Sequence, residues 1–317
     1  MKSSQAFKRG ALALALLLGP VLCFAAVPAG APNAAAPYSA KGADTCLSCH
    51  EGPEVNGVFH GAHAAQGDVR APFGKGQLQC EACHGPGGNH AKRVKKGDRR
   101  PPMIRFGRKV ETPVAVQNAM CLGCHEKSQP SGWHVGPHDA NQVSCAACHD
   151  SHTAKDAVLA RSTQPEVCYG CHVAERGQFQ RPYAHPVRQG KIGCSDCHDP
   201  HGTTADKQLV RSTVNDTCYE CHAEKRGPLL WEHEPVSEDC SSCHSPHGSS
   251  NRGMVKLRGP LLCQSCHSQQ GHPGVAYGPQ SLPGGSSPAI AVPLGNCTNC
   301  HTQVHGSNHP SGWSLTR

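Results

Sequence analysis

The sequence has 317 residues with 35 glycines and 26 prolines, but only 3 tryptophans, 5 tyrosines and 6 phenylalanines. So little aromatic surface cannot offset the conformational entropy of a chain this long, which excludes an ordinary side-chain core. The formal net charge of +7 is modest, and the unusual feature is the presence of 21 cysteines and 23 histidines.

Residues 1–25 predict a secretory signal peptide. Basic residues at positions 2, 8 and 9 precede the apolar run ALALALLLGPVLCFA, and small residues near Ala25 suit cleavage. Cys23 would leave with this segment, and Leu22 before it argues against a lipoprotein site. No later stretch approaches the roughly 20 apolar residues that a spanning helix needs. We therefore expect an exported chain, residues 26–317, that cannot cross a bilayer unaided.

The remainder of the chain is dominated by one motif, Cys-x-x-Cys-His, which occurs ten times and uses 20 of the 21 cysteines. In chain order the sites are Cys46-Cys49-His50, Cys80-Cys83-His84, Cys121-Cys124-His125, Cys145-Cys148-His149, Cys168-Cys171-His172, Cys194-Cys197-His198, Cys218-Cys221-His222, Cys240-Cys243-His244, Cys263-Cys266-His267 and Cys297-Cys300-His301.

This motif is the attachment signature of c-type haem. Two thiols three residues apart lie on one side of a helical turn, where each can form a thioether to the porphyrin, and the next histidine can bind the iron. A zinc or disulfide array would not require histidine at the same position every time. We therefore predict ten covalent c-type haems, with the ten motif histidines as proximal iron ligands.

Ten haems would also supply the missing core, because each is a large apolar plate. We expect the fold of a multihaem cytochrome c: mostly irregular, with short α-helices at the motifs, little or no sheet and an elongated chain of haems. Without the signal peptide the chain keeps 27 basic and 23 acidic residues, and the propionates of the haems add negative charge. The basic sequence therefore does not indicate nucleic-acid binding.

A second histidine follows every motif, at a spacing that alternates between the two members of a motif pair. After the first member the interval is 13 residues for His63, His138 and His185, 11 for His233 and five for His272. After the second member it is three residues for His152, His201 and His247, four for His305 and six for His90. We predict that these ten are the distal iron ligands. His60, His134 and His309 are left over, and the choice between His305 and His309 stays open.

His201 shows what such a histidine can do. It lies three residues after His198, so the porphyrin blocks its route to the far face of the same haem. We expect His201 to bind the iron of a neighbouring haem, and the segment CHDPHG then holds two haems close together. Two imidazoles leave iron no open position, which favours low-potential electron transfer. A multihaem reductase, the enzymatic alternative, often carries Cys-x-x-Cys-Lys, and this sequence has none.

Two segments interrupt the repeat. Residues 92–109, KRVKKGDRRPPMIRFGRK, contain nine basic residues and one acidic residue. They are interpreted either as a solvated linker that neutralises propionates or as a docking surface for a barrel or an acidic cytochrome. Residues 273–296 carry no charge and predict a loop before the last haem.

Residues 216–248, DTCYECHAEKRGPLLWEHEPVSEDCSSCHSPHG, and the ending CHTQVHGSNHPSG at 300–312 resemble the MtrA, MtoA and PioA group of decahaem cytochromes, the DmsE family. The similarity runs from about Lys41 to the C-terminus. The resemblance implies a wire seated in an outer-membrane β-barrel porin of the MtrB kind, which joins periplasmic carriers to extracellular cytochromes, iron or mineral. It also places all twenty histidines in the family's ligand pattern. CHDSHT at 149 and CHGPGGNH at 84 depart from that pattern.

The motif pairs divide the chain into five dihaem modules, residues 46–90, 121–152, 168–201, 218–247 and 263–309. A chain of polar loops could cross a bilayer only inside a closed barrel, because its backbone groups would otherwise be unsatisfied. We therefore expect an electron conduit in the periplasm, held at the outer membrane by a porin, with iron oxidation and iron reduction both open. The alternative is a soluble periplasmic electron shuttle or store.

Overall fold

The computed structural model describes residues 27–28, 30–126, 132–267, 297–299, 301–310 and 312–315. The signal peptide with Cys23, the uncharged segment 273–296, His272 and Cys300 lie outside the described residues. Predictions on these positions therefore stay predictions.

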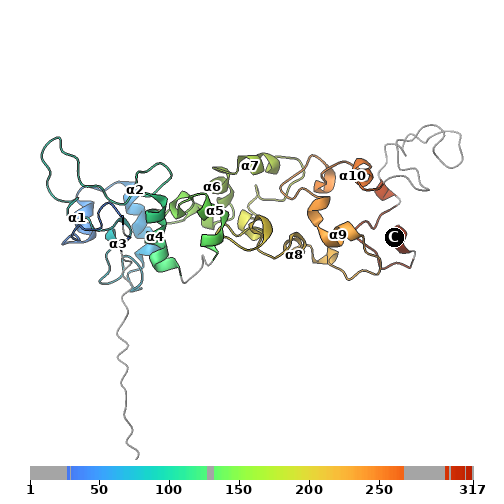
Figure 1. Cartoon of the computed structure of the whole chain (residues 1–317), viewed down its shortest axis with the longest axis horizontal. Coiled ribbons are helices and arrows are strands. Elements are labelled where there is room, and N and C mark those ends of the chain that lie inside the picture. The colour runs from blue at the N-terminus through green and yellow to red at the C-terminus, as the bar shows by residue number, and fades with distance from the viewer. Residues whose placement is uncertain are drawn as a thin grey trace, which may run out of the picture.

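The chain is elongated, and its motif pairs follow one another along the long axis of the molecule (Figure 1). Helices α1 to α4 lie at one end, α5 to α8 in the middle, and α9 and α10 at the other end. Sequence neighbours thus remain spatial neighbours, as expected for a row of similar modules.

The helices are short, and α4 with 12 residues is the longest of those described. The α-helices are α1 (Ala43–Leu47), α2 (Pro53–Asn56), α3 (Glu81–His84), α4 (Val114–His125), α5 (Pro137–Ala140), α6 (Gln164–Tyr169), α7 (Val173–Phe179), α8 (Val214–Tyr219), α9 (Glu234–Glu238) and α10 (Leu261–Gln264). The 3-10 helices are η1 (Gly57–His60), η2 (Ala62–Ala64), η3 (Trp133–Val135), η4 (Cys145–Ala147), η5 (Ala157–Leu159), η6 (Cys194–Asp196), η7 (Asp206–Gln208), η8 (Ala223–Lys225), η9 (Cys240–Ser242), η10 (Arg252–Met254), η11 (Cys297–Asn299) and η12 (Gly312–Ser314).

Extended pairing is limited to four isolated bridges within the described residues, for example Tyr183 with Ser249 and Trp231 with Ser307. The predicted fold class, short helices in a mostly irregular chain with little or no sheet, is therefore confirmed. None of the described helices has the length and apolar character needed to span a membrane.

Buried apolar side chains form two small clusters in the described part of the chain. One contains Ala31, Ile104, Val116 and Met120, and the other contains Tyr169, Phe179 and Val187. Clusters of three or four side chains bury too little apolar surface to order a chain of this size. This agrees with the expectation that bound haem supplies most of the interior.

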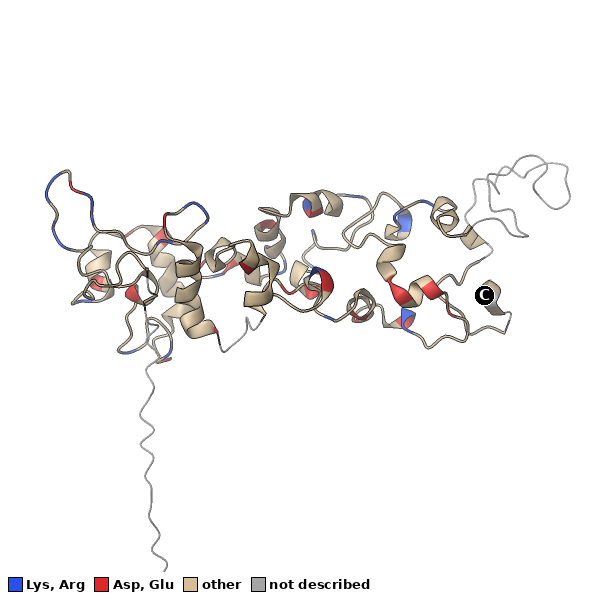
Figure 2. Ribbon diagram, in the orientation of Figure 1, with Lys and Arg blue, Asp and Glu red and all other residues tan. Residues whose placement is uncertain are grey.

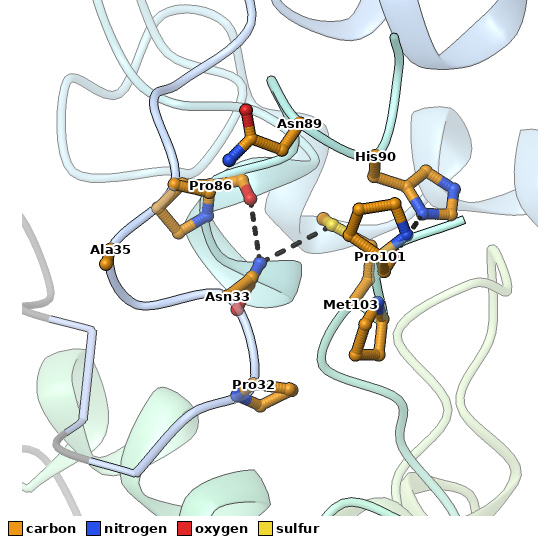
Figure 3. Close-up of a pocket in the computed structure, with 10 residues that line it drawn as sticks. Pro32, Asn33, Ala35, Pro86, Asn89, His90, Pro101 and Met103 are labelled. Atoms are coloured by element: carbon orange, nitrogen blue, oxygen red, sulfur yellow. Dashed lines mark hydrogen bonds between the residues drawn. The ribbon is translucent and has the colours of Figure 1, made fainter. Parts of the chain in front are cut away.

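A segment that we call the N-terminal strap, residues 30–39, packs against the second motif. The Nδ2 atom of Asn33 donates hydrogen bonds of 2.9 Å to the carbonyl oxygens of His84 and Pro86. Figure 3 shows the bond to Pro86. Buried Glu81 accepts hydrogen bonds from the backbone N–H of Ser39 and from that of Gly87. The strap therefore closes the end of the molecule over the first module.

The basic segment 92–109 forms a largely exposed loop at the same end (Figure 2). Its Arg100 donates hydrogen bonds of 2.6 and 2.8 Å to the carbonyl oxygens of His90 and Lys92. The loop is thus attached to the chain directly at His90, one of the predicted distal ligands.

Candidate haem-binding sites

The motifs fold as single helical turns. In the nine motifs that begin at residues 46, 80, 145, 168, 194, 218, 240, 263 and 297, the N–H of the motif histidine donates to the carbonyl of the first motif cysteine, for example His198 to Cys194 at 3.0 Å and His267 to Cys263 at 2.8 Å. The first motif of each pair lies at the C-terminal end of an α-helix, and the second begins its own short turn. A turn of this kind presents both thiols and the imidazole to one side, as covalent haem attachment requires.

Nine motif histidines each face one of the predicted second histidines. The ring centres of these pairs are 6.0 to 6.4 Å apart. The pairs are His50–His90, His125–His63, His84–His152, His149–His201, His172–His138, His198–His247, His222–His185, His244–His305 and His267–His233.

This spacing has the size of an iron with two imidazole ligands. A metal–imidazole bond is roughly 2.0 Å long, and a ring nitrogen lies about 1.1 Å from its ring centre, so two imidazoles on opposite sides of one metal place their centres roughly 6.2 Å apart. Aromatic rings in direct contact span a range of about 4.5–7 Å between their centres, whereas the nine pairs all fall between 6.0 and 6.4 Å. The paired histidines therefore fit a haem iron between them.

The hydrogen bonds of the rings also fit metal ligation. Where the partner of Nδ1 is a backbone carbonyl, which can only accept, Nδ1 carries the proton and Nε2 keeps its lone pair for a metal. The motif histidines bonded in this way, at 2.6 to 2.9 Å, are His84 to Ile104, His198 to Lys207, His244 to Gly253 and His301 to Ser314. The second histidines bonded in this way, at 2.7 to 2.9 Å, are His90 to Pro101, His138 to Pro200, His152 to Glu54, His185 to Pro246 and His233 to Val304.

Burial favours the neutral form that a metal ligand must adopt. It is the largest cause that lowers the pKa of five of these imidazoles below its ordinary value: His63, His84, His201, His247 and His305. The facing histidine lowers the pKa further, as His125 does for His63.

The cysteines show that the sites follow one another in sequence order. Within each motif pair the two first cysteines lie close enough that the second raises the pKa of the first: Cys80 for Cys46, Cys145 for Cys121, Cys194 for Cys168, Cys240 for Cys218, and Cys297 for Cys263. Between successive pairs, the second cysteine of one motif lies close to the second cysteine of the next motif. Burial raises the pKa of the former, and the latter raises it further: Cys124 for Cys83, Cys171 for Cys148, Cys221 for Cys197, and Cys266 for Cys243. Contacts within and between pairs alternate, so the sites form one continuous row.

The ring pairs reveal how the motif pairs are tied together. A histidine that follows the first motif of a pair faces the first motif of the next pair, as His138 does with His172. From the second pair onward, a histidine that follows the second motif faces the second motif of the preceding pair, as His201 does with His149, whereas His90 in the first pair faces His50 of its own pair. Each internal module thus gives one histidine to each neighbour and receives one from each.

Single hydrogen bonds join these exchanged histidines across module boundaries. Nδ1 of His138 donates to the carbonyl of Pro200, the residue before His201. His185 donates in the same way to Pro246, before His247, and His233 donates to Val304, before His305. The segment CHDPHG therefore holds the second histidines of two adjacent sites at once.

The histidines that were left over by the spacing take other positions. The structure places His63, and not His60, opposite His125. Nδ1 of His134 lies 3.3 Å from the carboxylate of Asp139. His305 faces His244. His90 and His152, which follow the two motifs that depart from the family pattern, face His50 and His84.

Three kinds of participant were not predicted from the sequence. The carbonyl acceptors of the imidazoles, Glu81 beneath the N-terminal strap, and Asp156, whose Oδ2 accepts from Nδ1 of His149 at 2.7 Å, all come from the structure. Carbonyls have no signal in a sequence. Asp156 could have been noticed, because it ends the short segment after an atypical motif.

Helical turns with paired thiols, neutral imidazoles at metal-spanning distance and a serial order of sites define a class of protein. The chain is a multihaem electron-transfer cytochrome that carries c-type haems. Comparison with known proteins agrees. A family model described as a doubled CXXCH motif matches residues 185–227 and 233–272, and one described as cytochrome c-type protein NrfB-like matches residues 80–163.

Two curated relatives carry the comparison further. The chain is 45% identical over 291 residues to "Multiheme cytochrome MtrA" of Shewanella baltica, an alignment that spans 88% of this chain and 83% of the relative. It is 29% identical over 148 residues to "Cytochrome c-type protein NrfB" of Haemophilus influenzae, over 40% of this chain and 63% of that protein. The chain therefore belongs to the MtrA-type multihaem cytochromes, as the resemblance indicated.

Proposed function

We propose that the chain binds ten c-type haems, each through two cysteines and two histidines. The twenty cysteines of the motifs form the thioethers, and the motif histidines are the proximal ligands. The nine ring pairs supply the distal ligands of nine irons, and His272, the second histidine that remains, is assigned to the iron of His301, the motif histidine that remains. Support comes from the ring spacing of 6.0 to 6.4 Å and from the Nδ1 bonds to carbonyls.

Two imidazoles on every iron would leave no open position for a substrate. Such iron cycles between the ferric and ferrous states, and its potential is set by axial ligands and their hydrogen bonds. The protein's own contribution is to fix the rings and the order of the sites. Five dihaem modules, with the bounds predicted from the motif pairs, describe that order.

We propose further that this row is an electron conduit across the outer membrane. The observation that carries this proposal is the continuous, single-file order of the sites along an elongated molecule (Figure 1). A single catalytic centre does not require redox sites at both ends of the molecule, whereas a wire does. The similarity to MtrA over 88% of the chain supports the same role.

The conduit would work from inside an outer-membrane β-barrel porin of the MtrB kind. In that position the chain faces the periplasm at one end and the cell exterior at the other, and it joins periplasmic cytochromes to extracellular ones. A row of haem sites is suited to cross a hydrocarbon core of roughly 30 Å. Iron is the proposed extracellular partner, and a low-potential wire can serve either its oxidation or its reduction.

Proteoliposomes test this function directly. The cytochrome and its porin are inserted together, with a membrane-impermeant reductant outside and a redox dye inside. We expect dye reduction to be much faster than in liposomes with the porin alone. Equal rates would contradict the conduit, and a stable, porin-free monomer in the periplasm would then support the soluble shuttle.

A further inference from the structure

The motif histidines do not all bond to the same kind of acceptor. Nδ1 of His84, His198, His244 and His301 donates to backbone carbonyls. Nδ1 of His149 instead donates to the carboxylate of Asp156, with an Nδ1–Oδ2 distance of 2.7 Å.

The sequence after the motif explains the difference. His198 and His244 reach carbonyls nine residues further on, at Lys207 and Gly253, and both of these residues have positive φ, 55° and 73°. After His149 the segment HDSHTAKD lacks the Pro-Gly frame and reaches Asp156 in seven residues. The shorter loop thus puts a charged side chain where the others put a neutral carbonyl.

Asp156 is held in place by the rest of its turn. Its Oδ1 atom accepts from the backbone N–H of Val158 at 3.3 Å and from that of Asp150 at 3.4 Å, and it caps helix η5. The side chain is only 14% exposed, whereas His149 is 41% exposed. A fixed carboxylate in a poorly hydrated position interacts more strongly with its donor than one in water.

The ring opposite His149 also has a carboxylate beside it. Nδ1 of His201 lies 3.5 Å from Oδ1 of Asp199, which accepts from the backbone N–H of His201 at 2.9 Å. A cation also lies beside this motif, because Arg108 donates to the carbonyl of Ala147 at 3.5 Å. Arg108 contacts the motif backbone and not an imidazole, so it does not alter the ligands themselves.

A carboxylate that accepts a hydrogen bond from a ligating imidazole makes that imidazole a stronger electron donor. A more electron-rich ligand stabilises ferric iron relative to ferrous iron and so lowers the reduction potential of a haem. We propose that Asp156, assisted by Asp199, holds the haem at Cys145, Cys148 and His149 at a lower potential than the haems whose motif histidines donate to carbonyls. This inference rests on the proposed ligation of that haem by His149 and His201.

The consequence is an energetic step in the fourth of ten sites. Electrons would occupy this site less readily than the sites whose motif histidines donate to carbonyls. Asp156 is therefore a tuning residue for transport along the row, since it acts on iron through His149.

Asp156→Asn removes the charge and keeps the shape of the side chain. Redox titration of the purified holoprotein, followed by the haem absorbance, measures the effect. We expect one component, about one tenth of the total amplitude, to move upward by about 59 mV, which corresponds to a tenfold change in the one-electron equilibrium. A titration curve that coincides with that of the unmodified protein would overturn the proposal.

A matched control and a second variant secure the result. Asp239 also caps a 3-10 helix beside a motif, where its side chain accepts from the backbone N–H of Ser241 and does not bond to a histidine. Asp239→Asn should therefore leave the redox titration curve unchanged. Asp199→Asn removes the other carboxylate, which is 42% exposed, and should give a smaller upward shift. If Asp156→Asn fails to assemble, Asp199→Asn tests the same reasoning. An unchanged redox titration curve in both carboxylate variants refutes the proposal.

His201→Met separates this inference from the ligation on which it rests. If His201 ligates the haem of His149, its replacement changes the spectrum and potential of one haem. A changed spectrum in His201→Met with no shift in Asp156→Asn refutes the tuning role alone. An unchanged spectrum in His201→Met refutes the ligation and the tuning role together.

Discussion

The exchange of histidines between modules predicts the outcome of removing His247. Its ring centre lies 6.0 Å from that of His198 and the ring also packs on Phe179, with ring centres 5.3 Å apart. His247 follows His244 by three residues in sequence, yet the structure assigns it to the site of the preceding module. His247→Ala should therefore leave the iron of His198 with one axial ligand and leave the iron of His244 unchanged.

The magnitude follows from the number of sites. With ten motifs, one iron without its second imidazole converts about one tenth of the low-spin haem to high-spin haem. His198→Ala should convert the same tenth. Because both variants act on one iron, the double variant should also convert one tenth, whereas independent sites would add.

Electron paramagnetic resonance of the oxidised protein quantifies the high-spin fraction. His244→Ala combined with His247→Ala is the contrasting pair, and we expect two tenths of the haem to convert, because these histidines face different partners. His134→Ala, which removes a histidine bonded to Asp139, should convert none. Two tenths from the first double variant and one tenth from the second would refute the exchange.

Further predictions concern spectra, folding and the N-terminal strap. The planes of His149 and His201 differ by 5° and those of His63 and His125 by 82°, so the low-spin spectrum should contain distinct parallel and perpendicular components, and a single homogeneous signal would contradict this geometry. Protein made without haem maturation should show no cooperative thermal transition by circular dichroism, because two small apolar clusters cannot order the chain. Glu81→Ala should destabilise the first module by about 3 kcal/mol, because it leaves buried N–H groups without an acceptor. Limited proteolysis should then cut the N-terminal strap first. Unchanged resistance to the protease would show that these hydrogen bonds contribute little.

The attachment chemistry and the fold class could be predicted because they are local. A Cys-x-x-Cys-His turn needs only five consecutive residues, and the scarcity of aromatic residues already indicated that side chains would not form the core. Most of the second histidines could be selected by their intervals, which left only the choice between His305 and His309 open. His63 and His138, chosen over His60 and His134 by the 13-residue spacing, are the rings that face His125 and His172.

The assignment of each second histidine to a particular site could not be predicted. It depends on which modules lie side by side, and three residues of sequence do not reveal whether His201 turns towards the preceding or the following module. The acceptors of the imidazoles are also non-local: Pro200 accepts from His138, 62 residues away. Glu81, an acidic residue between two motif cysteines, looks exposed in the sequence and is buried because the strap covers it.

The reciprocal exchange of histidines has a consequence for how such a chain can change its length. An internal module, such as residues 168–201, gives His185 forward and His201 backward, and it receives His138 and His247 in return. Under the proposed ligation, a duplicate inserted at its boundary would meet the same donors and acceptors on both sides, so every iron would keep two imidazoles. Loss of a single motif would instead leave a histidine without an iron in one neighbouring module and an iron without its second histidine in the other. Duplication of a whole module would therefore lengthen such a row by two haems, and deletion of a whole module would shorten it by two.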